Sequence, residues 1–245
     1  MRTVNDNEKK EFDDFAENYK DELNHPIRNI IGGQEDIFLK IKAEWLLNHF
    51  QCNPLKYVAT DGDIKLLDYG CGNGGFLRML QLLNFNGEIE GCDISGKMLE
   101  EAAKLWNPGK PPVLHLIHDD GTDFPDNTYD IIVAVCVFHH ISQPKRIEVL
   151  EGIYRILKPN GRFFLFEHNP INPLTQWIVR QTPLDKNAVL LNKKTVLQSV
   201  KTAGFKPLET AYFLFFPPNI SFLRKLEPRL AWLPLGGQYV VVAEK

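Results

Sequence analysis

The feature that most constrains the fold is an alternation of short apolar runs with segments of helical periodicity. The apolar runs are IKLLDY, EIEGCDI, PVLHLIH, YDIIVAVCVF and GRFFLFEH. Between several of them lie segments such as GFLRMLQLLNF, in which apolar residues recur every three or four positions. Strands that alternate with helices favour right-handed crossovers, so the pattern predicts a mostly parallel sheet with helices on both faces.

The two ends of the chain add to this core. Residues 8–20 and about 35–50 each place apolar side chains on one helical face, which predicts two N-terminal helices. Near the other end, a predicted helix precedes the strands KPLETAYFLFF and GQYVVVAEK. Residues 217–237 separate the strands by too much chain for a tight hairpin, so we expect an insertion with some helix there.

Composition excludes several classes of protein. The 245 residues carry 28 Lys and Arg against 31 Asp and Glu, a net charge of -3 without long single-sign runs. This charge pattern does not favour a nucleic-acid partner. The chain starts with polar residues, and no apolar stretch reaches the ~18 to 20 residues of a membrane span, so we expect a cytoplasmic protein.

The four cysteines are Cys52, Cys71, Cys92 and Cys136, and no two of them form a CxxC pair. Metal and disulfide frameworks need closer or more regular spacing than this. We therefore interpret them as reduced thiols and predict no metal site.

The stretch LLDYGCGNGG is a glycine-rich turn, with an exposed backbone, between the first predicted strand and a helix. Gly70, Gly72 and Gly75 satisfy the dinucleotide pattern G-x-G-x-x-G, and Asp93 follows where an acid would hold a ribose. Asp68 precedes the first of these glycines by two residues. Because its carboxylate repels a pyrophosphate, we expect a nucleoside ligand with a positive centre near this edge.

The stretch LLDYGCGNG resembles the first motif of the class I S-adenosylmethionine (SAM)-dependent methyltransferases, an apolar strand followed by D-x-G-C-G-x-G. EIEGCDIS, IHDDGTDFPDNTYD, YDIIVAVCVFHHI and IYRILKPNGRFFLFEHNP are similar to the later segments of that family. Within it, the chain is similar to the small-molecule group that includes quinone-biosynthesis methyltransferases. The order of five such segments is a strong signal for fold and cofactor and a weak one for the acceptor.

The resemblance implies an α/β fold with a Rossmann-like, seven-stranded, mostly parallel sheet whose last strand is antiparallel. It also implies one domain over residues 1–245, with a helical lid in 1–60, a SAM-binding core in 61–170 and a substrate side in 171–245. Monomer and homodimer both stay open as oligomeric states.

The resemblance further implies which residues hold SAM, or its product S-adenosylhomocysteine. Most lie at the carboxyl ends of the first four strands; one lies on the lid helix and one at the start of the second core helix. They are Tyr19, Asp68, Tyr69, Gly70, Cys71, Gly72, Gly74, Asp93, Ile94, Met98, Asp119, Asp120, Gly121, Cys136 and Val137. Of the adjacent acids 119 and 120, we expect only one to face the adenine and favour the second.

The family's reaction is an in-line displacement in which a small-molecule acceptor attacks the sulfonium methyl group. A base matters only for a hydroxyl or an acidic carbon, and His139, His140, His168 and Glu167 are the candidates. An apolar or amphiphilic acceptor is our hypothesis, in a pocket lined by YFLFFPPNISFLRKLEPRLAW and by Trp177 in the loop after the fifth strand. Two alternatives are an NAD(P)-dependent oxidoreductase and a SAM-binding protein without catalysis.

Overall fold

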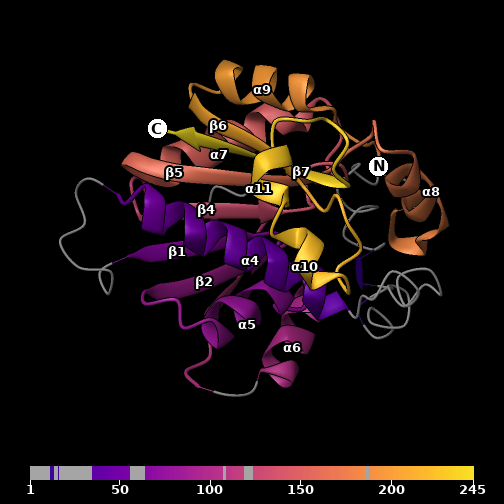
Figure 1. The fold of residues 1–245 in the computed structure, drawn as a ribbon. Coiled ribbons are helices and arrows are strands. Elements are labelled where there is room, and N and C mark those ends of the chain that lie inside the picture. The colour runs from indigo at the N-terminus through magenta and orange to yellow at the C-terminus, as the bar shows by residue number, and fades with distance from the viewer. Residues whose placement is uncertain are drawn as a thin grey trace.

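A computed structural model describes residues 12–13, 16, 35–55, 64–106, 109–118, 124–185 and 188–245. In this part of the chain the strands form one seven-stranded sheet in the order β3-β2-β1-β4-β5-β7-β6 (Figure 1). The strands are β1 (Lys65–Tyr69), β2 (Glu88–Asp93), β3 (Val113–Leu116), β4 (Tyr129–Val135), β5 (Leu157–His168), β6 (Lys206–Phe213) and β7 (Gln238–Glu244). β1 to β5 pair in parallel, whereas β7 runs antiparallel to both β5 and β6. The predicted fold class is confirmed.

Helices cover both faces of this sheet (Figure 1). They are α4 (Glu35–Cys52), α5 (Gly75–Leu82), α6 (Gly96–Leu105), α7 (Lys145–Ile156), α8 (Pro173–Gln181), α9 (Lys193–Thr202), α10 (Ser221–Arg224) and α11 (Glu227–Leu230), with a 3-10 turn η3 (Pro183–Asp185). Successive residues of β5 belong to opposite layers of the core. Phe164 packs in the layer of α4 and α5, and Phe163 in the layer of α7 and α9. A strand buried on both faces in this way has the near-continuous apolar sequence that we observe.

Two predictions about local structure are wrong. The segment that contains Trp177, which we expected to be a loop, forms α8. Asn172 starts this helix by accepting a hydrogen bond from the Thr175 amide, and proline occupies its first position. The fourth strand was expected to continue to Phe138 but ends at Val135, because Cys136 has a φ of 57°. Residues other than glycine rarely adopt this left-handed backbone conformation, which interrupts the strand.

The remaining predicted segments have mixed outcomes. The insertion between β6 and β7 is present and contains α10 and α11. Most of the predicted lid helix over residues 8–20 lies outside the described residues. None of the helices in the described ranges is long and apolar enough to cross a lipid bilayer.

Candidate functional site

Two pockets open at the carboxyl edge of the parallel strands and share a wall. The first lies over the ends of β1, β2 and β4, and the second lies between α4, α8 and the segment that follows β6. Val135, Cys136 and His140 line both pockets. A group bound in one pocket would therefore face a group bound in the other across this wall.

The floor of the first pocket is the glycine turn after β1. Gly70, Gly72 and Gly74 all have positive φ values, of 76°, 51° and 73°. A Cβ atom at Gly70 would also lie 2.6 Å from a methyl group of Val137. Only glycine fits this backbone and this spacing, so the turn presents bare peptide groups to the pocket.

Asp93 fixes the glycine turn to the end of β2. Its two carboxylate oxygens accept the backbone N–H groups of Gly72, at 2.8 Å, and Ser95, at 2.9 Å. Burial raises the pKa of Asp93, although these hydrogen bonds oppose the shift. A carboxylate has about four acceptor positions, so Asp93 can still accept hydrogen bonds from a ligand in the first pocket, which it lines.

Asp68 is a buried acid at the end of β1 with an exposed fraction of 1%. Its Oδ1 has no hydrogen-bond partner among the residues that the structure describes. Burial, and then the charge of Asp93, raise the pKa of Asp68 to about 8. The carboxylate thus lacks the positive partner that would stabilise its charged form.

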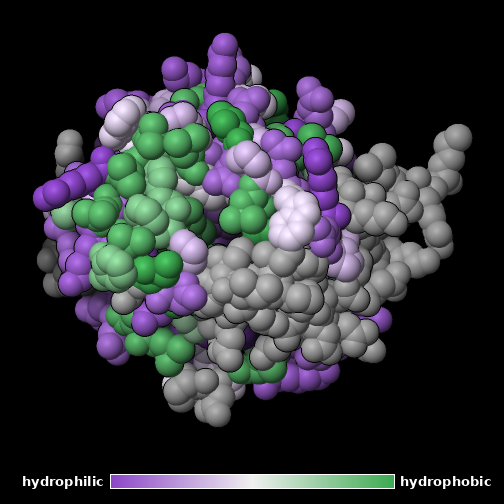
Figure 2. Space-filling view, turned by 45° about the vertical axis from the view of Figure 1, so that its right-hand side comes forward, coloured by the Kyte–Doolittle hydropathy of each residue, from purple (hydrophilic) through white to green (hydrophobic). Residues whose placement is uncertain are grey.

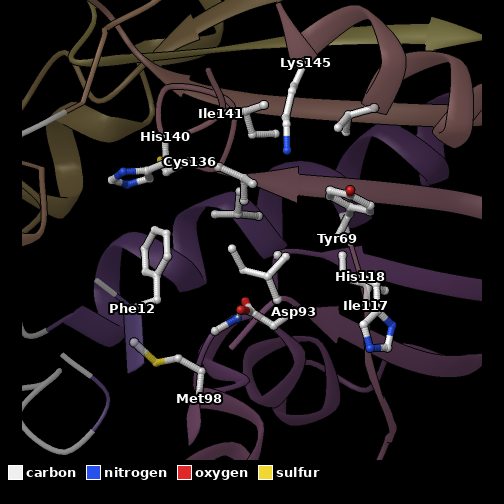
Figure 3. A pocket seen from close by; sticks show the side chains of 16 residues that line it. Phe12, Tyr69, Asp93, Met98, Ile117, His118, Cys136, His140, Ile141 and Lys145 are labelled. Atoms are coloured by element: carbon white, nitrogen blue, oxygen red, sulfur yellow. Dashed lines mark hydrogen bonds between the residues drawn. The ribbon is translucent and has the colours of Figure 1, made fainter. Parts of the chain in front are cut away.

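The rest of the first pocket is an apolar wall with polar groups at its rim (Figure 3). Ile94, Met98 and Ile117 form part of the wall, and Figure 3 shows Lys145 and His140 on the far side from Asp93. Sequence reasoning missed several lining residues. Nothing marks the apolar Phe12, Ile117, Ile141 and Val149 as different from core, and the polar His118 and Lys145 belong to no recognised motif.

The structure gathers most of the residues predicted to hold the cofactor. The first pocket is lined by Tyr69, Gly70, Gly72, Asp93, Ile94, Met98, Cys136 and Val137. Asp68, Cys71 and Gly74 are near the turn but are not among its described lining residues; the last of these caps α5. Tyr19, Asp119, Asp120 and Gly121 lie outside the described residues.

The predicted catalytic residues also come together, around a buried carboxylate–imidazole pair. His139 Nδ1 lies 2.6 Å from Glu167 Oε2, and the other carboxylate oxygen of Glu167 accepts the His139 backbone N–H at 3.3 Å. Asp185 reaches the same cluster from η3, with Oδ1 3.5 Å from His139 Nε2 and 3.4 Å from His140 Nε2. No sequence pattern pointed to this acid.

The charges of this cluster act on one another. Burial lowers the pKa of His139, but Glu167 and Asp185 outweigh it and raise that pKa to about 10. Burial and the neighbouring His139 charge lower the pKa of His168 to about 3, and lower that of His140 as well. The Gln238 amide lies 3.3 Å from His168 Nδ1, which suits a neutral ring with its hydrogen on Nε2.

The second pocket has a mainly apolar lining. Leu174, Ile178 and Val179 of α8 line one side, and residues 214–218 line another. Trp177 is not among the described lining residues and is 44% exposed, so the prediction that it lines the pocket is wrong. Hydrophobic side chains gather in patches on the face seen in Figure 2, and the segment between β6 and β7 also exposes Phe222.

Comparison with known proteins gives this architecture a family. Residues 67–165 match the family model described as "Methyltransferase domain". A demethylmenaquinone methyltransferase from Lysinibacillus sphaericus is 28% identical over 116 residues, 46% of this chain and 48% of that protein. A mitochondrial ubiquinone biosynthesis O-methyltransferase from Candida albicans is 32% identical over 112 residues, 44% of this chain and 33% of that protein.

Solved structures extend the likeness in fold. A SAM-dependent methyltransferase from Thermotoga maritima, described as a possible histamine N-methyltransferase, superposes with a TM-score of 0.64 at 17% identity, covering 96% of this chain and 99% of the other. The chain spans less than half the length of the two relatives named above. The matched segment holds the glycine turn, Asp93 and the end of β4. Residues 67–165 thus match the methyltransferase domain family, and the fold around them is that of solved SAM-dependent methyltransferases.

Proposed function

We propose that this protein is a SAM-dependent methyltransferase that acts on a small apolar or amphiphilic acceptor. The observation that carries the proposal is the pair of pockets with a shared wall. SAM would occupy the first pocket and the acceptor the second, so that the methyl group crosses near Cys136 and His140. Such a transfer requires the reacting atoms to approach within about 3 to 3.5 Å in line.

The residues of the first pocket fit SAM. Asp93 retains acceptor positions for the two ribose hydroxyls, and Met98 and Ile117 offer an apolar wall for the adenine. The buried carboxyl group of Asp68, whose Oδ1 has no hydrogen-bond partner among the described residues, favours a ligand with a positive centre on this side of the molecule. A cationic ligand would stabilise the charged form of that acid, whereas the pyrophosphate of a dinucleotide would gain nothing from it, which favours SAM over the NAD(P) alternative.

When bound, SAM supplies an activated methyl group, and the chain supplies position and charge. The glycine turn and Asp93 fix the nucleoside, while the apolar lining of the second pocket excludes water around the acceptor. His139, His140, His168 and Glu167 stay our candidates for a proton that leaves an acceptor hydroxyl or acidic carbon. His140 is the one of these that lines both pockets.

The names of the relatives support the class of acceptor. One is a demethylmenaquinone methyltransferase and another a ubiquinone biosynthesis O-methyltransferase, and these names point to quinone-type acceptors. The apolar second pocket suits such a ring or an isoprenoid tail better than a polar metabolite. We further propose a single domain over residues 1–245, a cytoplasmic location and a monomer or homodimer that does not bind nucleic acid.

Two measurements test the proposal. Native mass spectrometry and calorimetry should show binding of SAM or S-adenosylhomocysteine, with no competition from NADH. Incubation with methyl-labelled SAM and pools of quinols and other phenols should then give a labelled product. NADH binding that SAM does not displace would favour the oxidoreductase. Tight SAM binding without a product in any pool would favour the SAM-binding protein without catalysis.

A further inference from the structure

The histidine cluster has a geometry that its hydrogen bonds do not explain. His139, His140 and Asp185 each offer one possible ligand atom, and these atoms all lie within 4.8 Å of one another. His139 Nε2 is buried and has no hydrogen-bond partner in the described part of the chain. A buried nitrogen of this kind is costly unless it binds something.

Two distances from Asp185 are those expected between ligands of one metal ion. Asp185 Oδ1 lies 3.5 Å from His139 Nε2 and 3.4 Å from His140 Nε2, which is long for a hydrogen bond between charged groups. Metal–ligand bonds of about 2.0 to 2.2 Å at tetrahedral angles place neighbouring ligand atoms roughly 3.3 to 3.6 Å apart. Both distances from Asp185 fall in this range, and the ligand atoms of the two histidines lie within 4.8 Å of each other.

The surroundings of His139 support the same interpretation. Glu167 accepts the Nδ1 hydrogen at 2.6 Å and also holds the backbone of the same residue. A metal-binding histidine usually donates its second ring hydrogen to a carboxylate in this way, which points the free nitrogen at the ion. His168 has its Nδ1 against the Gln238 amide and lies beside the three ligands without joining them.

We propose that His139 Nε2, His140 Nε2 and Asp185 bind one divalent transition-metal ion, such as Zn²⁺, at the wall between the two pockets. Two imidazoles and one carboxylate are a ligand set typical of such ions, and three protein ligands leave a position open. All three residues line the second pocket, so that position faces the space proposed for the acceptor.

The charge of the cluster is compatible with a cation. Glu167 and Asp185 are buried acids, with exposed fractions of 0% and 6%, and Lys42 contributes one positive charge to the described lining of the second pocket. Metal binding would displace any proton from the two ligand nitrogens, and the two acids would then stabilise the divalent ion. A proton on one imidazole alone leaves the 3.4 and 3.5 Å distances long for hydrogen bonds between charged groups.

The role of the ion rests on the proposed function, but its binding does not. In the open position the ion would hold an acceptor oxygen near Cys136. It would also lower the pKa of an acceptor hydroxyl, whose proton would pass to solvent. Neither His139 nor His140 would then need to act as a base.

The test is metal binding itself. Protein stripped with a chelator is titrated with ZnCl₂ by calorimetry, and Co²⁺ is used to read the coordination geometry from its visible absorption. We expect one ion per chain and the strong absorption of four-coordinate cobalt. Asp185→Asn should weaken binding by about 100-fold or more, and Glu167→Gln by ~10 to 100-fold.

The control is Asp126→Asn, which changes an exposed acid that pairs with Arg155 far from the cluster. It should bind zinc as the wild type does. Crystals soaked in ZnCl₂ give a second test that needs no variant, since the anomalous peak must lie between the three ligand atoms. A peak elsewhere, or zinc affinity that Asp185→Asn leaves unchanged, would overturn the metal site without affecting the evidence for SAM.

Discussion

The two pockets are built in different ways although they share a wall. The floor of the first comes from two neighbouring strands: the end of β1, the glycine turn that follows it and an acid at the end of β2. The second collects side chains from α4, α8, η3 and the segment after β6, which are far apart in the chain. Backbone geometry thus determines the floor of the first pocket, whereas tertiary packing determines the second pocket.

Asp93→Ala is the strongest test of the first pocket. It removes both the hydrogen bonds that fix Gly72 and Ser95 and the proposed contacts to the ribose hydroxyls. Charge-assisted hydrogen bonds contribute about 1.5 to 3 kcal/mol each, so we expect SAM affinity to fall about 100-fold or more by calorimetry. If Asp93→Ala binds SAM as tightly as the wild type, Asp93 does not hold the ribose.

Gly70→Ala tests whether the bare backbone is required. The new methyl group would lie 2.6 Å from Val137 at a φ of 76°, so the turn must shift. We expect SAM to bind about 30-fold more weakly, which corresponds to ~2 kcal/mol. The double variant Gly70→Ala, Val137→Ala relieves the clash but not the backbone strain and should recover only part of the loss. Full recovery would show that φ is unimportant.

The raised pKa of Asp68 predicts that the affinity for SAM depends on pH. Below about 8 this acid is protonated in the free protein, and a positively charged ligand requires the carboxylate. SAM affinity should therefore fall by up to about tenfold for each pH unit below 8. Asp68→Asn should remove this dependence. Because SAM titrates in the same way in both experiments, the ratio of wild-type to Asp68→Asn affinity at each pH reports Asp68 alone. A ratio that is constant from pH 6 to 8 contradicts the assignment.

The same acid has an effect on stability with the opposite sign. The pKa of Asp68 is higher in the folded chain, about 8, than its ordinary value of 3.8. The folded state thus holds a proton that the unfolded state loses, so stability falls as the pH rises from about 4 to 8. In thermal unfolding without ligand, Asp68→Asn should be the more stable protein at pH 8, and a less stable variant would refute the burial argument.

The smallest expected effect concerns the separation of the pockets. Ile178→Trp adds bulk to the lining of the second pocket and should lower acceptor turnover about tenfold, while SAM affinity stays within about twofold. Ile171→Trp, at an exposed position before α8, is the matched control and should change neither. A tenfold loss of SAM affinity in Ile178→Trp would show that a change away from the shared wall also disturbs the first pocket.

The sequence predicted most of the fold and of the first pocket because their causes are local. Glycine turns, strand periodicity and the acid after β2 each follow from neighbouring residues, and the alternation of strands with helices determines most of the sheet. The end of β4 at Cys136 could not be predicted in this way, because a cysteine side chain does not indicate a positive φ.

The second pocket was harder to predict because its residues meet only after folding. Asp185 joins His139 across 46 positions, from a short turn that has no periodicity. The prediction of a loop at α8 overlooked its start signal, an asparagine cap followed by proline at the first position of the helix. The histidines were found as separate candidates, whereas their arrangement around one point is visible only in three dimensions.

The shared wall has a consequence for how the two ligands are measured. A molecule that repacks Cys136 or His140 from one side alters the surface offered to the other side. The affinities are then linked, and thermodynamics requires the same factor in both directions. If an acceptor changes the affinity for SAM by some factor, SAM changes the affinity for the acceptor by the same factor. An unknown acceptor can therefore be found by screening compounds for their effect on SAM affinity.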